Sequence, residues 1–343
     1  MSKLVYQQSQ KSLLFLGLIL VLVPVLMLQF SNTSAQAGVA ERTISCNPSG
    51  GSGGLAPGTY ADTTLFGQSV VIIVSENYDP STPTLLTFYL HGDGGGYTFY
   101  SQDGRPLNQL VRDNGWIYVA PQAPQLEGGS HAWYSTGVST SDAGNANIEA
   151  NAQLFENILE DMFAKYNICQ NILLGHSASG GSWFYDAYFI PTRGDQYPAF
   201  MNLACGSSGI NAEGFWPSAP FYDDLLAFKD DAAIQNRTHL HYTIGNQDFL
   251  YDEAERAVPH YQSLGFDVTT DFLDMVGHCD FDLSAKTIDY WAAVNNAITI
   301  SNDPIDETPM PTETPVPTPT VTATPFPEGF LDKFVYLPVV VRE

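Results

Sequence analysis

Three side chains in the second half of the chain have the types and the order of a nucleophile, an acid and a base. Ser177 lies in the run Gly175-His176-Ser177-Ala178, which matches the start of the G-x-S-x-G pattern, and Asp248 and His278 follow it. A serine hydroxyl becomes a strong nucleophile when an imidazole removes its proton and a carboxylate fixes the imidazole tautomer. We therefore predict that Ser177, Asp248 and His278 form a catalytic triad for acyl transfer.

The match leaves two questions open. Ser179 stands where the pattern has its last glycine, and we expect this one hydroxymethyl group to be tolerated in the first turn of the following helix. Asp274 competes for the role of the acid, but it lies within the strand expected before His278. Asp252 and Asp280 are the better alternatives to Asp248.

Acyl transfer also needs hydrogen-bond donors for the developing oxyanion, each worth about 3 to 4 kcal/mol of transition-state stabilisation. The backbone N–H of Ala178, directly after the expected nucleophile, is one predicted donor. The second comes from the glycine-rich run 91–96, where Asp93 and Gly94 are both candidates. A carboxylate near an oxyanion is unfavourable, so the side chain of Asp93 must point away.

The elements that must position these residues alternate between strands and helices. Expected strands cover 70–74, 85–90, 116–120, 172–174, 199–204, 239–244 and 268–275, and expected helices cover 147–166, 222–228, 252–264 and 283–297. This alternation predicts one α/β domain, with a mainly parallel central sheet covered by helices on both faces. Parallel strands end at a common edge, so the three candidate side chains are expected to meet there.

These motifs together resemble the α/β-hydrolase superfamily over about residues 58–298. The resemblance is carried by the runs Glu76-Asn77-Tyr78-Asp79-Pro80, Leu90-His91-Gly92, Gly175-His176-Ser177 and Gly277-His278. Within the superfamily the chain is similar to secreted feruloyl esterases and polyhydroxybutyrate depolymerases, whereas 120–124 and 132–134 are similar to carboxylesterases and lysophospholipases. The resemblance implies a single α/β-hydrolase domain that hydrolyses carboxylic esters through an acyl-enzyme and needs no cofactor.

Aromatic side chains are candidates for a pocket that holds an acyl or phenolic group. The candidates are Tyr97, Trp133, Tyr134, Trp183, Trp216 and Phe221, and we assign substrate binding to Trp133, Tyr134 and Trp216. Trp133 is the first choice, because it lies in a long loop beyond a strand end. Aromatic residues make up 13% of the chain, so a place in the core is the competing interpretation for each.

The ends of the chain differ in composition from its centre. Residues 1–37 read as a signal peptide or an uncleaved anchor, because two lysines precede the apolar run 13–30 and Ala35-Gln36-Ala37 suits cleavage. A Gly-rich segment (38–57) precedes the catalytic domain (58–300), which a Pro/Thr-rich linker (301–328) follows. The apolar tail 329–343 is a sorting or attachment segment, or a short strand. We expect a secreted protein, with cell-surface attachment as one outcome.

The net charge and the cysteine content restrict which substrates, partners and metal ions the chain is expected to bind. A formal charge of −24 opposes binding to nucleic acid and to anionic surfaces and favours a neutral ester, polymeric esters included. Outside the cytoplasm, four cysteines favour disulfides, and their wide spacing argues against a metal site. Three full pairings are possible, with Cys279 joined to Cys205 or to Cys46 as equal choices.

Two other classes of function fit the same sequence. A peptidase of the same fold would use the same three side chains against an amide. A non-catalytic binding or surface-display module would account for the Pro/Thr-rich linker and the apolar tail.

Overall fold

The computed structural model describes residues 38–102, 104–125, 129–133, 142–207 and 237–301. The chain divides into two compact units, Met1–Ile305 and Asp306–Glu343, and the described residues all belong to the first. The expected signal peptide, apolar tail and helix 222–228, and the expected linker beyond residue 301, lie outside the described residues. Within the described ranges, no helix is both long enough and apolar enough to span a bilayer.

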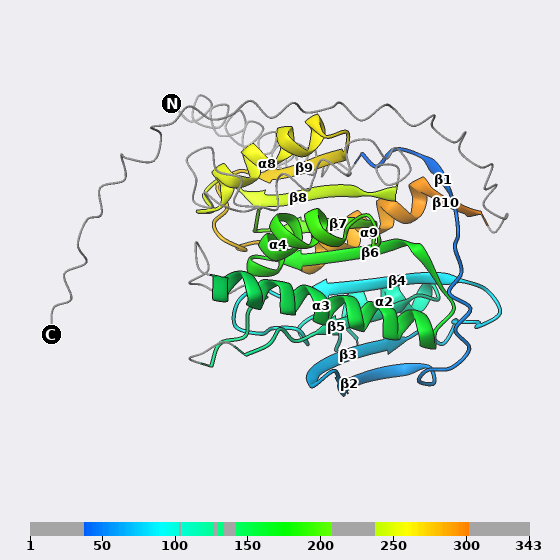
Figure 1. Ribbon diagram of the computed structural model, residues 1–343. Coiled ribbons are helices and arrows are strands. Elements are labelled where there is room, and N and C mark those ends of the chain that lie inside the picture. The colour runs from blue at the N-terminus through cyan, green and yellow to red at the C-terminus, as the bar shows by residue number, and fades with distance from the viewer. Residues whose placement is uncertain (1–37, 103, 126–128, 134–141, 208–236, 302–343) are drawn as a thin grey trace, which may run out of the picture. The chain divides into compact units, whose positions relative to one another are not determined.

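One eight-stranded sheet forms the centre of the described residues (Figure 1). Its strands, in chain order, are β2 (Gly58–Leu65), β3 (Gln68–Val74), β4 (Thr84–Leu90), β5 (Ile117–Pro121), β6 (Ile168–Ala178), β7 (Ala199–Ala204), β8 (His239–Gly245) and β9 (Asp267–Leu273). They lie in the order β2-β3-β5-β4-β6-β7-β8-β9, and β3 is antiparallel to both of its neighbours while the pairs from β5 to β9 are parallel. The predicted mainly parallel sheet is confirmed.

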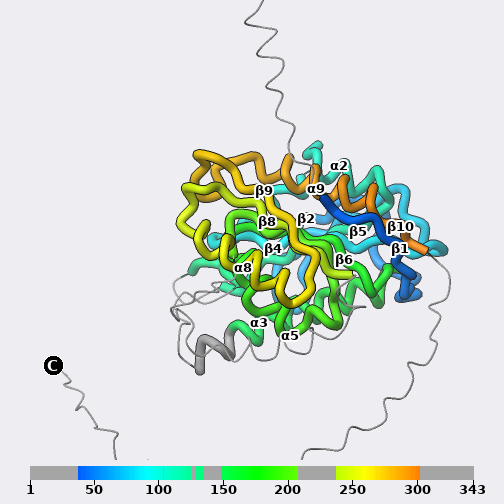
Figure 2. Tube along the Cα trace, turned by 90° about the horizontal axis from the view of Figure 1, so that it is seen from above, coloured from blue at the N-terminus to red at the C-terminus, as the bar shows by residue number. Residues whose placement is uncertain are grey.

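Helices cover both faces of this sheet, as the view from above shows (Figure 2). One face carries α3 (Asp142–Lys165), α4 (Gly180–Phe184), the π-helix η1 (Tyr185–Phe189), α5 (Ile190–Arg193) and α8 (Tyr251–Ser263), and the other carries α2 (Pro106–Asp113) and α9 (Leu283–Ala297). Each face has its own hydrophobic core. The prediction of a single α/β domain with helices on both faces is confirmed.

The central strands are apolar along their whole length because both of their faces are covered. Residues 70–74 of β3 and 85–90 of β4 are buried, and apart from Thr87 they are aliphatic or aromatic. Sheets that are buried on both sides have such continuous apolar runs, whereas half-exposed strands alternate. This is why the sequence predicts the central strands well.

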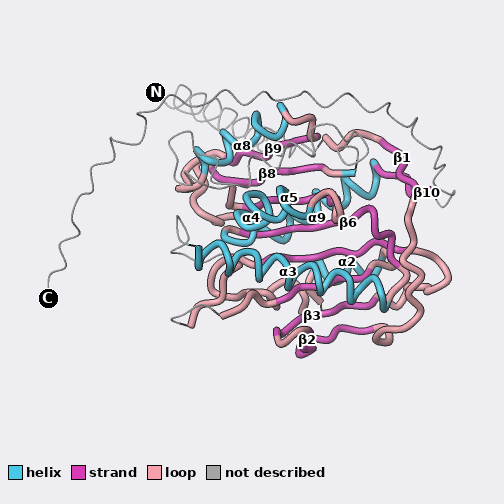
Figure 3. The backbone as a smooth tube through the Cα atoms, viewed as in Figure 1, coloured by secondary structure: helices cyan, strands magenta, loops and turns pink. Residues whose placement is uncertain are grey.

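A short strand pair joins the two ends of the described region (Figure 3). Strand β1 (Arg42–Ser45) pairs in parallel with β10 (Ile298–Ser301), and a disulfide connects Cys46 to Cys169 at the start of β6. Ser49 N–H also donates to the carbonyl oxygen of Ile168. Part of the expected Gly-rich segment is thus held against the sheet that carries β6.

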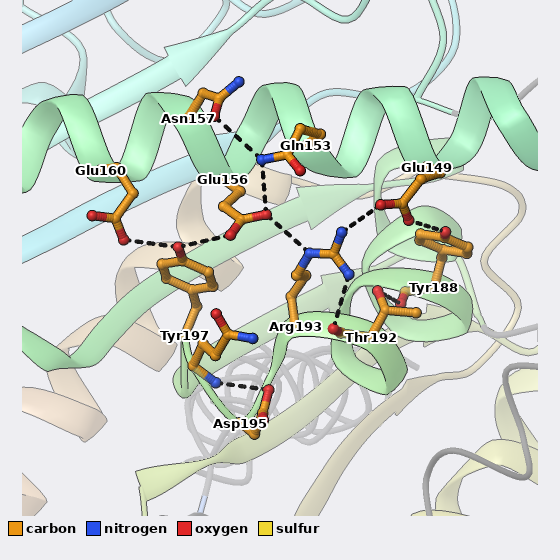
Figure 4. A network of polar contacts seen from close by, with 11 residues as sticks. Glu149, Gln153, Glu156, Asn157, Glu160, Tyr188, Thr192, Arg193, Asp195 and Tyr197 are labelled. Carbon is orange, nitrogen blue, oxygen red and sulfur yellow. Dashed lines mark hydrogen bonds and ion pairs between the residues drawn. The ribbon is translucent and has the colours of Figure 1, made fainter.

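A polar network fastens the helical segment after β6 to helix α3 (Figure 4). The guanidinium of Arg193 contacts Glu149 at 2.5 Å and Glu156 at 3.0 Å, and the hydroxyl of Tyr197 donates to Glu160 at 2.8 Å. The three glutamates lie on one side of α3. The network holds the segment after β6 by directional contacts in addition to apolar packing.

His176, on β6, is buried among aromatic rings on the face that α9 covers. Its ring stacks on Tyr89 with centroids 4.3 Å apart and meets Tyr100 and Trp291 edge-on, each at 5.2 Å. Burial lowers the pKa of His176 to about 3, so the imidazole is neutral in the folded chain at pH 7.

This burial predicts that His176 makes the folded state sensitive to acid. The unfolded imidazole has a pKa near 6.5, so its contribution is complete above that value and is lost as the pH falls toward about 3. In His176→Gln, the slope of the free energy of unfolding between about pH 6 and pH 5 should be smaller by about 1 kcal/mol per pH unit. Urea denaturation of both proteins checks this, and equal slopes would contradict it.

Candidate active site

A strained turn at the carboxyl edge of the sheet lies at Ser179, between β6 and α4. Its backbone has φ 47° and ψ −117°, a left-handed conformation that a non-glycine residue adopts at a cost of about 1 to 3 kcal/mol. Ser179 N–H donates to the carbonyl oxygen of Ala204 at 2.9 Å, and the Ser179 carbonyl accepts from Trp183 N–H at 3.0 Å. The turn is therefore fixed from both sides.

Three glycines leave room for this turn. A Cβ atom on Gly181 would lie 2.2 Å from the carbonyl oxygen of Leu90, and one on Gly206 would lie 2.3 Å from that of Ser179. A Cβ on Gly92 would lie 3.1 Å from Cβ of Ser179. At Gly181 and Gly206 the neighbouring backbone is too close for a side chain, and at Gly92 a Cβ would fit only tightly, as in a tight strand-to-helix turn.

Ser179, His278 and Asp248 form a hydrogen-bonded chain. Oγ of Ser179 lies 2.9 Å from Nε2 of His278, and Nδ1 of His278 lies 2.9 Å from both carboxylate oxygens of Asp248. The carboxylate side chain is fully buried, whereas the imidazole is 30% exposed. Because an ionised carboxylate only accepts, Nδ1 carries the proton and Nε2 is left to accept the proton of Ser179.

The predicted contact between Ser177 and His278 is wrong. Oγ of Ser177 is buried and lies 2.8 Å from Oγ of Ser182, which itself donates to the carbonyl oxygen of Ala204 at 2.9 Å. Ser182 has one hydroxyl proton, so Ser177 must donate to it. Ser177 is thus a strand residue that ties β6 to α4, and Ser179 takes the position against His278.

The sequence contains a signal for Ser179 in the position of Gly181. An alignment of the pattern on Gly175 selects Ser177, but Gly175 is required by core packing, because a Cβ there would lie 2.3 Å from the Phe88 ring and 2.5 Å from the Met201 sulfur. Gly181, two residues after Ser179, is the glycine that the turn requires. Aligned on Gly181, the run 177–181 has serine in place of the first glycine of G-x-S-x-G.

The predicted contact between Asp248 and His278 is present, and two joined turns position it. After β8, the N–H groups of Asn246 and Gln247 donate to the carbonyl oxygens of Leu273 and Val276 in the turn after β9. Asp248 also accepts from Leu250 N–H at 2.9 Å. The acid and the base therefore belong to one hydrogen-bonded unit at the ends of neighbouring strands.

The competing acid Asp274 faces a different partner. Its carboxylate accepts from the side-chain amide of Asn246 at 3.1 Å, and the amide oxygen of Asn246 accepts from Met275 N–H at 2.9 Å. Asp274 thus supports the joined turns, whereas Asp248 contacts the imidazole.

A disulfide fixes the segment that carries His278. It joins Cys279 to Cys205, the residue directly after β7. Of the two pairings expected for Cys279, the structure therefore has the one with Cys205. Ala204, the residue before Cys205, accepts the N–H of Ser179, so this covalent link connects the histidine segment to the strand that holds the serine turn.

The glycine-rich loop after β4 lies against Ser179 and is held by His91. Nε2 of His91 accepts from Ala123 N–H at 2.8 Å, so Nδ1 carries the proton and donates to the carbonyl oxygen of Gly92 at 2.5 Å. Burial lowers the pKa of His91 to about 4, which keeps the ring neutral. In a planar trans peptide the N–H opposes the carbonyl, so the N–H of Asp93 points away from the His91 ring.

Two of the predicted oxyanion donors need correction. The N–H of Gly94 donates to the carbonyl oxygen of His131 at 3.0 Å, so it is already used within the loop. Ala178 precedes Ser179 and is the last residue of β6, so the donor after the serine becomes Gly180. Asp93 remains a candidate through its backbone N–H.

The pocket prediction for Trp133 is also wrong. Its side chain is fully buried, stacked on Phe184 with centroids 5.5 Å apart and edge-on to Phe155. A loop residue beyond a strand end has here been drawn into the core between α3 and α4. Tyr134 and Trp216 lie outside the described residues. In the part of the chain that the structure describes, no group of three His, Cys, Asp or Glu side chains is arranged to hold a metal ion.

Comparison with known proteins finds likeness in structure only. No family model matches the chain, and no curated protein matches it in sequence. Esterase PE8 is 18% identical, covering 67% of this chain and 99% of its own, with a TM-score of 0.45. Acyl-protein thioesterase 2 of Zea mays is 17% identical (66% and 98% covered, TM-score 0.45), and the Bacillus cereus carboxylesterase is 15% identical (66% and 94%, TM-score 0.43).

At these identities the likeness assigns no activity, and the chemistry rests on the geometry of the site. The strand-to-helix turn at Ser179 comes first in the chain, the carboxylate after β8 second, and the histidine after β9 third. Serine, acid and histidine in that order, at the carboxyl edge of a mainly parallel sheet, are the arrangement of the α/β-hydrolase fold. The strand order and the positions of these three side chains give the chain this fold, as the resemblance implies.

The close approach at Gly181 makes a prediction about the turn. In Gly181→Ala, the added methyl group collides with the Leu90 carbonyl and must push α4 away from β4, so the free energy of unfolding should fall by about 1 to 3 kcal/mol. Gly96→Ala is the matched control, because nothing lies within 4 Å of a Cβ at Gly96. Urea denaturation that finds the two variants equally stable would contradict the packing at Gly181.

Proposed function

We propose that the protein is a serine hydrolase that cleaves carboxylic esters through an acyl-enzyme on Ser179. The observation that carries the proposal is the chain of contacts from Oγ of Ser179 to Nε2 of His278 and from Nδ1 to the buried carboxylate of Asp248. This arrangement supplies a nucleophile, a base of fixed tautomer and a carboxylate that stabilises the imidazolium as it forms.

The reaction has two halves. In the first, Oγ of Ser179 attacks the ester carbonyl carbon as His278 takes its proton, and the imidazolium then gives that proton to the departing alcohol oxygen. In the second, His278 takes a proton from water, the water oxygen bonds to the acyl carbon, and Ser179 leaves with the proton. The carboxylate of Asp248 accepts the hydrogen bond from Nδ1 and orients the ring in both halves.

The oxyanion donors of this mechanism are the backbone N–H groups of Gly180 and Asp93. Gly180 is the first residue of α4, and the first N–H groups of a helix have no partner within the helix. The Gly92–Asp93 peptide lies against Ser179 and is oriented by the hydrogen bond from His91 to its carbonyl. Because Asp93 would donate through its backbone N–H, its side-chain carboxylate takes no part in binding the oxyanion. An acidic residue is therefore compatible with this position in the loop.

The substrates that fit best are neutral esters outside the cytoplasm. The charge of −24 repels anionic substrates, and two disulfides accord with the secretion expected from the leader. We place feruloyl and acetyl esters and polyesters in this class, as the sequence resemblance implies. A panel of p-nitrophenyl esters, feruloyl esters and peptide amides tests the choice, and faster cleavage of the amides would favour a peptidase.

Exchange of each serine separates the two candidates for the nucleophile. Ser179→Ala should fold as the wild type does and lose about 10⁶-fold in kcat on p-nitrophenyl esters, because the attacking oxygen is gone. Ser177→Ala should keep most of its activity and lose about 1 kcal/mol of stability with the hydrogen bond to Ser182. The reverse pattern of activities would overturn the assignment.

Exchange of each aspartate tests the acid. Asp248→Asn removes the acceptor that fixes the His278 tautomer, so kcat should fall by about 10⁴-fold. Asp274→Asn is the control, because Asp274 contacts Asn246 instead of the imidazole. Comparable losses in steady-state kinetics of both variants would contradict the role given to Asp248.

A further inference from the structure

Phe249 and Met275 are large apolar side chains that the fold leaves in solvent beside the site. Phe249 is 74% exposed and Met275 is 77% exposed, the highest values among the exposed large hydrophobic residues that the structure describes. A single exposed apolar residue is ordinary on a protein surface. Phe249 differs because its ring packs on the imidazole of His278, with centroids 4.4 Å apart and planes inclined by 36°.

Hydrogen bonds constrain the backbone of the turns that carry both residues. Phe249 directly follows Asp248, whose N–H donates to the carbonyl oxygen of Gly245 at 3.0 Å. Met275 has a left-handed backbone with φ 58°, its N–H donates to Asn246, and its sulfur lies 3.2 Å from the amide nitrogen of Gln247. Both residues belong to the joined turns after β8 and β9, so their exposure comes with a constrained backbone.

The proton transfer to the leaving alcohol indicates which part of the ester lies near Phe249. The acyl group stays on Ser179, whereas the alcohol oxygen must come within reach of Nε2 of His278 to receive its proton. The alcohol part of the ester therefore lies on the histidine side of the site. The phenyl ring of Phe249 packs on the same imidazole with centroids 4.4 Å apart, which is close enough to Nε2 for the alcohol part to contact it.

We propose that Phe249 contacts the alcohol part of the ester and makes the site selective for apolar or aromatic alcohols. This inference rests on the proposed ester hydrolysis at Ser179. Contact with such an alcohol covers part of the Phe249 side chain that is otherwise exposed to water, and a ring-to-ring contact adds to this gain. Met275 is a second exposed apolar side chain on the same joined turns.

The first test compares benzyl and ethyl esters of one acid. Benzyl alcohol and ethanol have similar acidity, so the comparison separates binding from leaving-group strength. The acid part is that of the ethyl ester, among acetate, butyrate and ferulate, that the wild type hydrolyses fastest. Phe249→Ala should lower kcat/KM for the benzyl ester by about tenfold and leave the ethyl ester nearly unchanged. Phe66→Ala is the matched control, an exposed phenylalanine on the turn between β2 and β3 at the opposite edge of the sheet.

The second test separates substrate contact from positioning of His278. Deacylation takes place after the alcohol has left, so its rate should be equal in Phe249→Ala and wild type. The p-nitrophenyl ester of the same acid gives this rate as the linear phase that follows the pre-steady-state burst. If Phe249 only holds the imidazole, the variant instead loses rate on both esters and in deacylation, and its pH profile shifts.

Each outcome bears on the proposal. A selective loss on the benzyl ester with unchanged deacylation supports it. If the wild type is active but Phe249→Ala loses rate equally on both esters, deacylates more slowly or keeps the wild-type selectivity, the role proposed for Phe249 is overturned. The proposed ester hydrolysis at Ser179 is then unaffected. If ester hydrolysis persists in Ser179→Ala, the proposed function is overturned, and the proposed alcohol subsite with it.

Discussion

The left-handed backbone of Ser179 is the constraint on which the rest of the site depends. A serine pays for this conformation with strain, and the fold keeps it by bonding the residue on both sides and by placing Gly92, Gly181 and Gly206 where three backbones converge. The turn aims the hydroxyl out of the sheet edge, toward the imidazole of His278. Without it, β6 would present the hydroxyl of Ser177 to the interior and nothing to a substrate.

The other two groups are positioned by a different device. The turn after β8 donates two backbone hydrogen bonds to the end of β9 and the turn that follows it, so Asp248 and His278 belong to one bonded unit. The disulfide from Cys279 to Cys205 then ties this unit to β7, whose last residue accepts the N–H of Ser179. The geometry of the three groups is thus set by neighbouring strand ends, a hydrogen-bonded turn pair and one covalent link. The same turn pair displays Phe249 at the histidine, which connects catalysis to the choice of alcohol.

Sequence patterns predict the parts of this structure that follow from burial and topology. The central strands were predictable because their apolar runs are continuous, and Asp248 and His278 because each lies in the turn that follows a strand. The serine that contacts His278 was not predictable, since two serines lie within three residues and the pattern does not show where β6 ends. Ser177 lies within the strand and Ser179 beyond it, and the difference appears only when Gly181 is seen against the carbonyl of Leu90. The predicted roles of Trp133 in substrate binding and of Gly94 as an oxyanion donor were wrong for a similar reason. Side-chain packing and hydrogen bonds within loops leave no periodic signal in the sequence.

The measurement that tests the central claim most directly is the identity of the serine that a fluorophosphonate modifies in the wild-type chain. The probe reacts with a serine whose proton an imidazole can remove, and fragmentation of the labelled peptide by mass spectrometry distinguishes residues 177 and 179. The account predicts one adduct, on Ser179, that is lost when the protein is unfolded before labelling. An adduct on Ser177, or no adduct on either serine of the folded chain, would contradict it.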